Sequence, residues 1–304
     1  MSIPQFSTII STLVANGFHI RRVDRFADSN SIITTYKYDK LGAVVNYGLL
    51  FTDDDGDTPI ITTLLKLSKT EAFTPLVVGD FIKTAQAKTY TNEQFFNFFG
   101  GIVNTGLILV PNLSDLLDQL GHNVLPESLN GVPDDLHEIY IKESFQFLME
   151  SPTRRYGADR RFEPLVDGLV LSKARFLLPL ESKAYSNGYS FQADDIKRFA
   201  SYVNDNNERY STYFGRVFTF VVITGHFLDS EESIQGRSDE LYNLCNSKLC
   251  CIESKVLGEI VDLVKNHPVE RSSIVWKNIL TNLKIKTKHV QNEITRIQKD
   301  KLHL

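Results

Sequence analysis

Apolar side chains occur at helical spacing near the start of the chain and then in short runs of strand length. Residues 3–16 place Phe6, Ile9 and Leu13 three or four positions apart, which predicts an amphipathic helix. The runs that follow have the apolar and β-branched composition of strands, and strands are expected over residues 31–38, 43–51, 60–67 and 107–110. Short helices are predicted over residues 93–99 and 113–120.

The pattern becomes longer and more regular after residues 121–134, a segment rich in Gly, Asn, Pro and Asp that we interpret as a linker. Beyond it, helical spacing predicts helices over residues 135–149, 192–204, 238–245, 254–265, 274–280 and 288–298. Continuous apolar runs predict buried strands over residues 217–224 and 249–252. Helices that alternate with buried strands are typical of an α/β fold.

Three regions follow from this organisation and from the length of 304 residues. We expect a separate α+β domain over residues 1–125, an α/β domain with a mixed central sheet flanked by helices over 126–268, and a basic helical tail over 269–304. The net charge is −4, but residues 1–125 carry 9 Lys and Arg against 12 Asp and Glu, whereas residues 270–304 carry 8 against 3. The basic tail can contact phosphates or form the solvated face of a helix.

The composition is that of a globular protein with a full core, with 42% hydrophobic and 23% charged residues. No run of about 18 apolar residues predicts a transmembrane helix, and the first residues do not form a secretory signal. The three cysteines, Cys245, Cys250 and Cys251, do not form a disulfide framework and are expected to be reduced and packed in the core. We therefore expect a cytoplasmic protein without a membrane partner.

Two apolar runs, separated by a short basic bend, predict a β-hairpin that carries the candidate chemistry. The first run contains Asp167, and the second ends in Glu181, Ser182 and Lys183. Because side chains alternate along a strand, Lys183 should lie on the same face as Glu181, and Ser182 should point the other way, into the core. Two carboxylates on adjacent strands can hold one Mg²⁺, with a substrate phosphate and the Ser182 backbone carbonyl as further oxygen ligands.

Phosphodiester hydrolysis needs a nucleophilic water, neutralised phosphate charge and a stabilised leaving oxygen, and Mg²⁺ held by carboxylates serves all three needs. In this interpretation Lys183 orients or deprotonates the water and offsets developing negative charge. Spacing alone fits equally well a surface hairpin with two carboxylates and a lysine. The metal interpretation is favoured because Asp167 lies inside an apolar run, where an ionised group costs free energy unless it has a task.

Four motifs follow one another along this half of the chain. They are Asp167-Gly168, Glu181-Ser182-Lys183-Ala184-Tyr185, Gln192-Ala193-Asp194 and Gly225-His226-Phe227. Their order and spacing resemble the FokI family of type IIS restriction-endonuclease cleavage domains, over roughly residues 139–265. Two positions depart from the family pattern: Glu181 replaces an aspartate, and Pro164 is displaced from its usual place before Asp167. Neither departure removes a required group.

This resemblance implies a PD-(D/E)xK nuclease domain with a restriction-endonuclease-like fold that cuts DNA with Mg²⁺. Asp167 and Glu181 match the metal carboxylates, and Lys183 matches the catalytic lysine. Asp194 and Arg198 match the pair that joins two such domains into a dimer, although their i, i+4 spacing also suits an ion pair within one helix. The element order of residues 1–125 loosely resembles the same core, without an acid and acid-x-lysine set.

Two arginine doublets, Arg154 with Arg155 and Arg160 with Arg161, come shortly before the hairpin. They can contact DNA phosphates or belong to a solvated loop, and both interpretations remain open. His226 lies at the end of a predicted buried strand, where we expect a hydrogen-bonded structural histidine rather than a catalytic base.

Three functions are compatible with these features. The first is a type IIS-like restriction endonuclease of double-stranded DNA, or a subunit of one, acting as a homodimer or heterodimer. Residues 1–125 would then recognise DNA or dock a partner, although their acidity argues against reading DNA. The second is a nuclease-fold interaction subunit that is active only when a partner delivers DNA. The third is a metal-dependent nuclease for repair or phage defence without a fixed site.

Overall fold

Contacts within the chain divide it into two units, Met1–Val103 and Asn104–Leu304. The structure is a computed structural model. It describes residues 6–16, 18–26, 30–38, 44–52, 58–79, 87–92, 94–95, 107–157, 165–267 and 269–302.

The first unit is a five-stranded mixed sheet with a helix before it and a helix within it. Its elements are α1 (Phe6–Ala15), β1 (His19–Arg25), β2 (Ser31–Tyr38), β3 (Val44–Phe51), α2 (Pro59–Glu71), β4 (Thr74–Val78) and β5 (Lys88–Tyr90). The strands lie in chain order, with β1, β2 and β3 antiparallel and β3, β4 and β5 parallel. Ile32, Leu50 and Val77 pack against Ile61 and Leu64 of α2.

Residues 60–67, predicted to be a strand, lie instead within helix α2. Pro59 occupies its first turn, where a missing N–H costs nothing. The hydroxyls of Thr62 and Thr63 donate to the carbonyls of Thr58 and Pro59, four residues back, which lets these β-branched residues sit in a helix. The buried strand predicted over residues 107–110 is also wrong, because a 3-10 turn, η2 (Leu107–Leu109), forms there. Of the helix predicted over residues 93–99, only residues 94–95 are among those described.

The second unit contains the predicted hairpin. Its elements up to the third helix are α4 (Leu113–Gly121), α5 (Pro133–Met149), β6 (Thr153–Arg155), β7 (Gly168–Ser172), β8 (Phe176–Lys183) and α6 (Asp195–Phe214). Then follow β9 (Thr219–Thr224), α7 (Glu231–Cys245), β10 (Lys248–Glu253), α8 (Ser254–Lys265), η4 (Arg271–Ser273), α9 (Trp276–Leu280) and α10 (Thr287–Leu302). This mixed sheet flanked by helices confirms the predicted α/β fold class.

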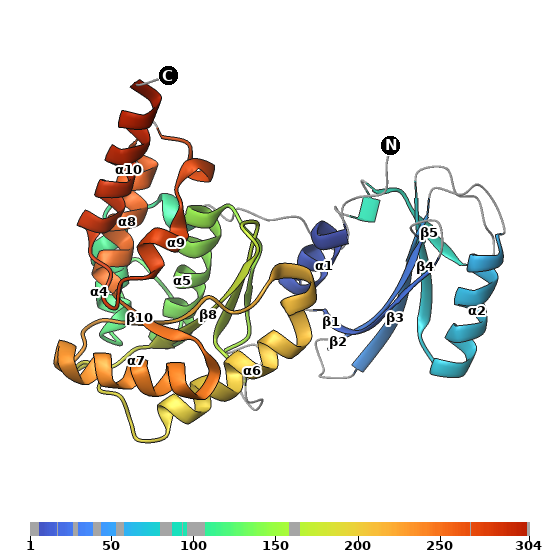
Figure 1. Cartoon of the computed structure of the whole chain (residues 1–304), viewed down its shortest axis with the longest axis horizontal. Coiled ribbons are helices and arrows are strands. Elements are labelled where there is room, and N and C mark those ends of the chain that lie inside the picture. The colour runs from blue at the N-terminus through green and yellow to red at the C-terminus, as the bar shows by residue number, and fades with distance from the viewer. Residues whose placement is uncertain are drawn as a thin grey trace. The chain divides into compact units, whose positions relative to one another are not determined.

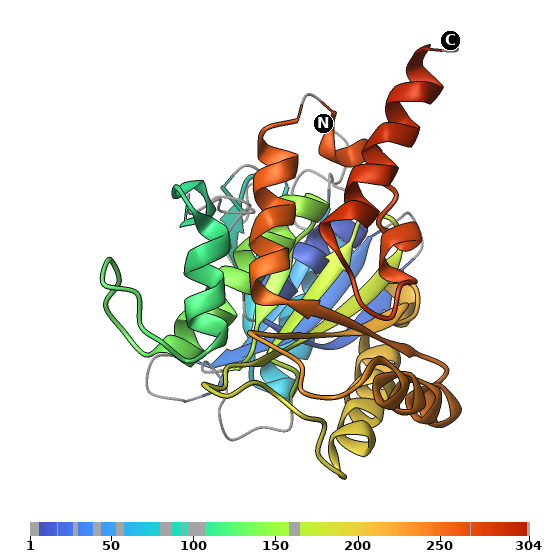
Figure 2. The same ribbon diagram turned by 90° about the vertical axis from the view of Figure 1, so that its left-hand side faces the viewer.

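Helices cover both faces of this sheet, whose order is β10-β9-β8-β7-β6 (Figures 1 and 2). On one face, Leu178 and Leu180 of β8 join the core formed with α4, α5, α8 and α10. On the other, α6 packs Phe199 against Phe220 of β9, with ring centroids 4.4 Å apart. Because β8 alternates its side chains, Ser182 faces the α5 side, and Glu181 and Lys183 face the α6 side.

The two sheets share one topology. In each, three antiparallel strands are followed by a helix and then by two parallel strands, and a helix precedes the first strand. Strands β2, β3 and β4 of the first unit carry no Asp or Glu, whereas their counterparts in the second unit include Glu181 of β8. The first unit therefore has the nuclease-like strand order without acids on these strands.

The unit boundary lies 22 residues before the one expected at residue 125. Helix α4 belongs to the second unit because Gly121 approaches Gly225, whose N–H donates to the Gly121 carbonyl at 3.3 Å. Residues 122–132 carry no helix or strand, as a linker should, but they connect α4 to α5 within one unit.

Residues 269–304 were expected to form a separate basic tail, but they complete the second unit. Val290, Ile294 and Ile297 of α10 are buried in its core. Residues 283–285 run beside β10. There the backbone N–H of Cys251 donates to the Leu283 carbonyl at 2.7 Å, and the backbone N–H of Ile285 donates to the Cys251 carbonyl at 2.9 Å. A tail that adds to the sheet edge and fills the core cannot be a detachable arm.

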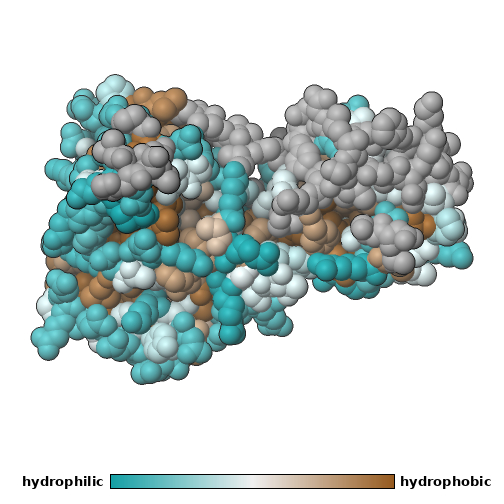
Figure 3. Space-filling model, turned by 45° about the horizontal axis from the view of Figure 1, so that its top comes forward, coloured by the Kyte–Doolittle hydropathy of each residue, from teal (hydrophilic) through white to brown (hydrophobic). Residues whose placement is uncertain are grey.

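Hydrophilic residues cover most of the face of the second unit seen at the left of Figure 3, and hydrophobic ones form small patches. Cys250 and Cys251 are buried, Cys245 is half-buried, and all three are free thiols. Within the described ranges, no helix combines the length and the apolar character needed to cross a membrane.

Candidate active site

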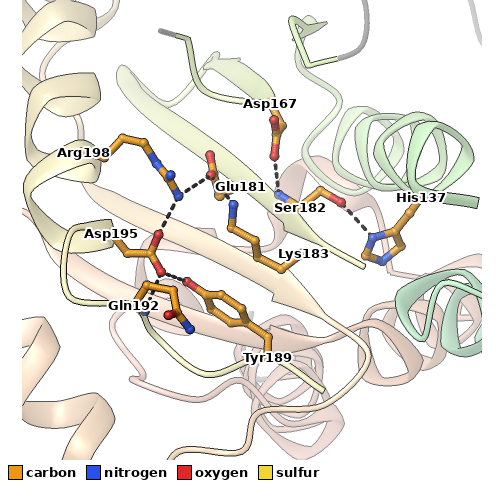
Figure 4. Close-up of polar contacts among 9 residues, drawn as sticks. All are labelled: His137, Asp167, Glu181, Ser182, Lys183, Tyr189, Gln192, Asp195 and Arg198. Carbon is orange, nitrogen blue, oxygen red and sulfur yellow. Dashed lines mark hydrogen bonds and ion pairs between the residues drawn. The ribbon is translucent and has the colours of Figure 1, made fainter. Parts of the chain in front are cut away.

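Asp167 directly precedes β7 and lies beside the end of β8. The last paired residues of the hairpin are Gly168 and Leu180, which places Asp167 opposite Glu181. One carboxylate oxygen of Asp167, Oδ2, accepts a hydrogen bond from the backbone N–H of Ser182 at 2.8 Å (Figure 4). The N–H and C=O of one strand residue point to the same side, so the Ser182 carbonyl faces the Asp167 side as well.

Glu181 and Lys183 meet on the α6 side of β8, as the alternation predicts. The Lys183 ammonium lies 2.7 Å from Oε1 of Glu181 (Figure 4). Glu181 is only 4% exposed, and its other oxygen, Oε2, is buried without a hydrogen-bond partner among the residues that the structure describes. A buried carboxylate oxygen without a partner is costly, and a bound cation would remove that cost.

The electrostatics of the site are dominated by two buried carboxylates and the ammonium beside them. Burial, together with the charges of Glu181 and Glu138, raises the pKa of Asp167 well above its usual range. Burial tends to lower the pKa of Lys183, but the neighbouring Glu181 and Asp167 outweigh it and leave that pKa raised. Lys183 is thus held as an ammonium, which suits charge neutralisation better than deprotonation of water.

Ser182 connects the hairpin to two helices through a histidine that sequence reasoning missed. Ser182 Oγ lies 2.8 Å from Nδ1 of His137 on α5, and Nε2 of His137 lies 2.7 Å from Oγ of Ser254 on α8. His137 is fully buried, and burial followed by the charge of His122 lowers its pKa to about 3. This histidine is therefore neutral and fixes the β8 end between α5 and α8.

The start of α6 brings a cation to the carboxylates. Arg198 Nη2 lies 2.6 Å from Oδ1 of Asp195 and 3.6 Å from Oε1 of Glu181 (Figure 4). The ion pair within α6 thus joins Arg198 to Asp195, not to Asp194 as its i, i+4 spacing suggested. Asp194 is exposed, and its side chain caps no backbone group of the helix.

The first arginine doublet lies on β6 and is half-buried. Arg155 Nη1 donates to the Asp135 carbonyl at 3.2 Å and lies 3.8 Å from Oε2 of Glu138, while the Arg154 guanidinium lies over the Tyr156 ring. Their DNA contact stays a prediction. Arg160 and Arg161 lie outside the described residues.

His226 is more exposed than its place at the end of a buried strand suggested, and its expected structural role stays a prediction. Its side chain is 56% exposed, and Nδ1 lies 3.5 Å from Oε1 of Glu253. The strand β9 ends two residues earlier, so His226 has already left the buried part of the sheet.

The residues present fit a Mg²⁺ ion. Within the described parts of the chain, no group of three or more His, Cys, Asp and Glu side chains could hold a metal. Asp167, Glu181 and the Ser182 carbonyl would form only a partial shell, and Mg²⁺ commonly keeps water and takes substrate phosphate oxygens as its other ligands.

The second unit thus has a mixed sheet with an acid before one strand and an acid-x-lysine at the end of the next, as the restriction-endonuclease-like interpretation of the sequence expects. The family model described as "FokI, cleavage domain" matches residues 131–286, just over half of the chain. The chain belongs to this family.

Two solved structures are similar to the chain. Restriction endonuclease FokI bound to DNA matches with a TM-score of 0.44 and 15% identity, and FokI alone with 0.41 and 16%. Each match covers 68% of this chain but only 37% and 36% of the FokI chains. No curated protein matches the chain.

Proposed function

We propose that this protein is a Mg²⁺-dependent endonuclease that hydrolyses phosphodiester bonds of double-stranded DNA, as a type IIS-like restriction endonuclease or a subunit of one. The observation that carries the proposal is the cluster of Asp167, Glu181 and Lys183 in a member of the FokI cleavage-domain family. The buried, unpartnered Oε2 of Glu181 supports a cation ligand at this position.

Each group has a defined task in this proposal. Asp167, Glu181 and the Ser182 carbonyl would hold Mg²⁺, which when bound supplies a nucleophilic water at neutral pH and neutralises phosphate charge. The Lys183 ammonium stabilises the negative charge that develops on the phosphate and orients the water. His137 keeps the Ser182 segment in place through its two hydroxyl contacts.

Cleavage of both strands needs two active sites, because one cluster addresses one strand at a time. We therefore propose a homodimer or heterodimer that forms along α6, where the family resemblance points to Asp194 and Arg198. Both are exposed in the structure. Residues 1–103 would recognise DNA or dock a partner, and the acid-free β2, β3 and β4 support a role other than cutting. The arginines 154, 155, 160 and 161 are proposed to contact DNA phosphates.

Purified full-length protein incubated with plasmid DNA and Mg²⁺ tests the proposal. Discrete fragments support a site-specific endonuclease, a smear indicates a nuclease without a fixed site, and intact plasmid indicates a subunit that needs a partner. Lys183→Ala should lower the cleavage rate at least about 100-fold without unfolding the protein. Lys173→Ala, at the exposed turn of the same hairpin, is the matched control and should cut normally. Undiminished cleavage by the Lys183 variant would overturn the site.

A further inference from the structure

Helix α10 begins on the rim of the second sheet that also carries the candidate active site. The strands β8, β9 and β10 run parallel and end on this rim, where Lys183, Thr224 and Glu253 pair in one row. The segment before α10 continues the parallel order beside β10, since Lys284 pairs with Cys251. The start of α10 is therefore three strand spacings from β8, or roughly 14 Å along the rim.

The basic residues of the region 270–304 differ in whether the fold uses their charge. Three of them form ion pairs with acids of the same unit: Arg271, Lys284 and Arg296. Lys286 and Lys288, which flank the first residue of α10, are exposed and form no ion pair within the described ranges. The unused positive charge thus includes two lysines on the rim of the active site.

A third exposed lysine lies close to these two, on α8. The Thr287 hydroxyl donates to Oε2 of Glu259 at 2.6 Å, which joins the first turn of α10 to α8. Lys255 precedes Glu259 by four residues, so it lies on the same face of α8, one turn nearer to the rim. It is exposed and also forms no ion pair among the residues that the structure describes. We call Lys255, Lys286 and Lys288 the rim lysines.

The positive charge on the rim is not balanced by the acid nearest to it on β10. Glu253, the last residue of β10, already has the Lys284 ammonium at 2.7 Å from its Oε1. Burial, followed by the charges of Lys288 and Lys286, lowers the pKa of His289. A cluster of like charges that the fold leaves uncompensated attracts a polyanion.

We propose that the rim lysines bind backbone phosphates of the DNA beside the bond that is cut, so that the duplex lies along the rim from β8 to α10. This inference rests on the proposed function. Lysine suits contacts that do not read sequence, because its ammonium is a compact charge on a flexible stem. A distance of roughly 14 Å corresponds to about four base pairs of duplex. The family model matches the chain only up to residue 286, so α10 lies beyond the matched segment.

Three other exposed lysines of the same unit provide a control of equal charge. Lys173 lies in the turn between β7 and β8, and Lys248 begins β10, so both lie at the end of the sheet opposite the rim. Lys299 lies on α10 about 16 Å along the helix from Lys288, and Figure 1 shows α10 leading away from β10 toward the C-terminus. Alanine at all three control lysines removes the same charge as alanine at all three rim lysines.

Binding of a short fluorescent duplex to the full-length variants, measured by anisotropy with Ca²⁺ replacing Mg²⁺ over a range of salt concentrations, tests the proposal. Each phosphate contact contributes about 0.9 to the slope of log affinity against log salt. The variant with alanine at the three rim lysines should therefore lose nearly three from this slope and bind on the order of 100-fold more weakly at low salt. Arginine at the same three positions should keep the slope, and the control variant should match the wild type. Urea unfolding should show that all variants are folded.

Two results would overturn the proposal. The first is an equal salt slope for the rim and control variants, which would show that only the net charge of the protein matters. The second is a slope that the arginine variant loses as fully as the alanine variant, because a phosphate contact needs only the charge. Wild-type protein that binds the duplex but never cuts plasmid contradicts the proposed function and leaves the rim comparison decisive. Wild-type protein that does not bind DNA contradicts both.

Discussion

The Asp167 carboxylate accepts a 2.8 Å hydrogen bond from the backbone N–H of Ser182. The backbone pairing of β7 with β8 ends at Gly168 and Leu180. Beyond that pair, the Asp167 side chain takes the place of a backbone carbonyl as the acceptor for the Ser182 N–H. Asp167 therefore holds the end of β8, and in the proposed function it would also offer its charge to a cation.

Replacing Asp167 by Asn should separate these two tasks. An amide oxygen still accepts the Ser182 N–H, but the buried charge is gone. Because the pKa of Asp167 is raised by burial and by neighbouring carboxylates, its ionised form destabilises the native state at neutral pH. We expect Asp167→Asn to raise the unfolding free energy in EDTA and to abolish stabilisation by Ca²⁺. Urea unfolding with and without Ca²⁺ measures both effects, and a variant that Ca²⁺ still stabilises argues against Asp167 as a ligand.

His137 should make the protein less stable in mild acid. Its native pKa is lowered to about 3, from an ordinary value of 6.5, by burial and by His122. Below pH 6.5, His137 of the unfolded chain binds a proton, whereas His137 of the native state stays neutral. The contribution of the neutral His137 to the unfolding free energy is therefore complete above pH 6.5 and falls as the pH falls toward 3.

The measurement is the difference in unfolding free energy between wild type and His137→Gln at several pH values in EDTA. This difference should be constant above pH 7 and should fall by up to about 1.4 kcal/mol per pH unit below pH 6. His226→Gln, at an exposed position, serves as the control. A His137 difference that does not change between pH 5 and 8 would contradict the buried neutral histidine.

Two helical glycines should respond to alanine in opposite directions. A Cβ on Gly121 would lie 2.7 Å from the backbone nitrogen of Gly225, and neither backbone can give way easily. Gly121→Ala should therefore cost about 1–3 kcal/mol of unfolding free energy. A Cβ on Gly236, inside α7, meets nothing within 4 Å, so Gly236→Ala should stabilise by about 0.4–1 kcal/mol. Thermal or urea unfolding compares them, and equal effects would refute the close approach of α4 and β9.

Helix α10 should contribute to stability as a core element. Ile294 is fully buried, so Ile294→Ala should cost about 2–5 kcal/mol. Lys288, on the same helix, is exposed, and Lys288→Ala should change the unfolding free energy by less than about 0.5 kcal/mol. Urea denaturation of both variants measures this. A small loss for Ile294→Ala would show that residues 287–302 do not complete the core.

The sequence by itself determined the hairpin and the residues that it brings together. Strand alternation is a local property, so the shared face of Glu181 and Lys183 and the opposite face of Ser182 followed from spacing of one and two residues. The motifs around Asp167 and Glu181 were sufficient to indicate the family. The apolar periodicity placed most helices of the second unit within a few residues of their observed ends. Among the predicted elements that the structure describes, residues 60–67 and 107–110 took the wrong class, because short apolar runs suit strands and helices alike.

The tertiary structure decided what depends on residues far apart in the chain. The place of α4 is set by Gly225, about a hundred residues away, and the place of α10 by the core that it fills. His137 could not be recognised because its two serine partners lie 45 and 117 residues away. Arg198 pairs with Asp195 because the loop after β8 fixes that carboxylate, a contact that helical spacing alone cannot select. Periodicity reports which face a side chain takes, whereas packing decides which partner it meets there.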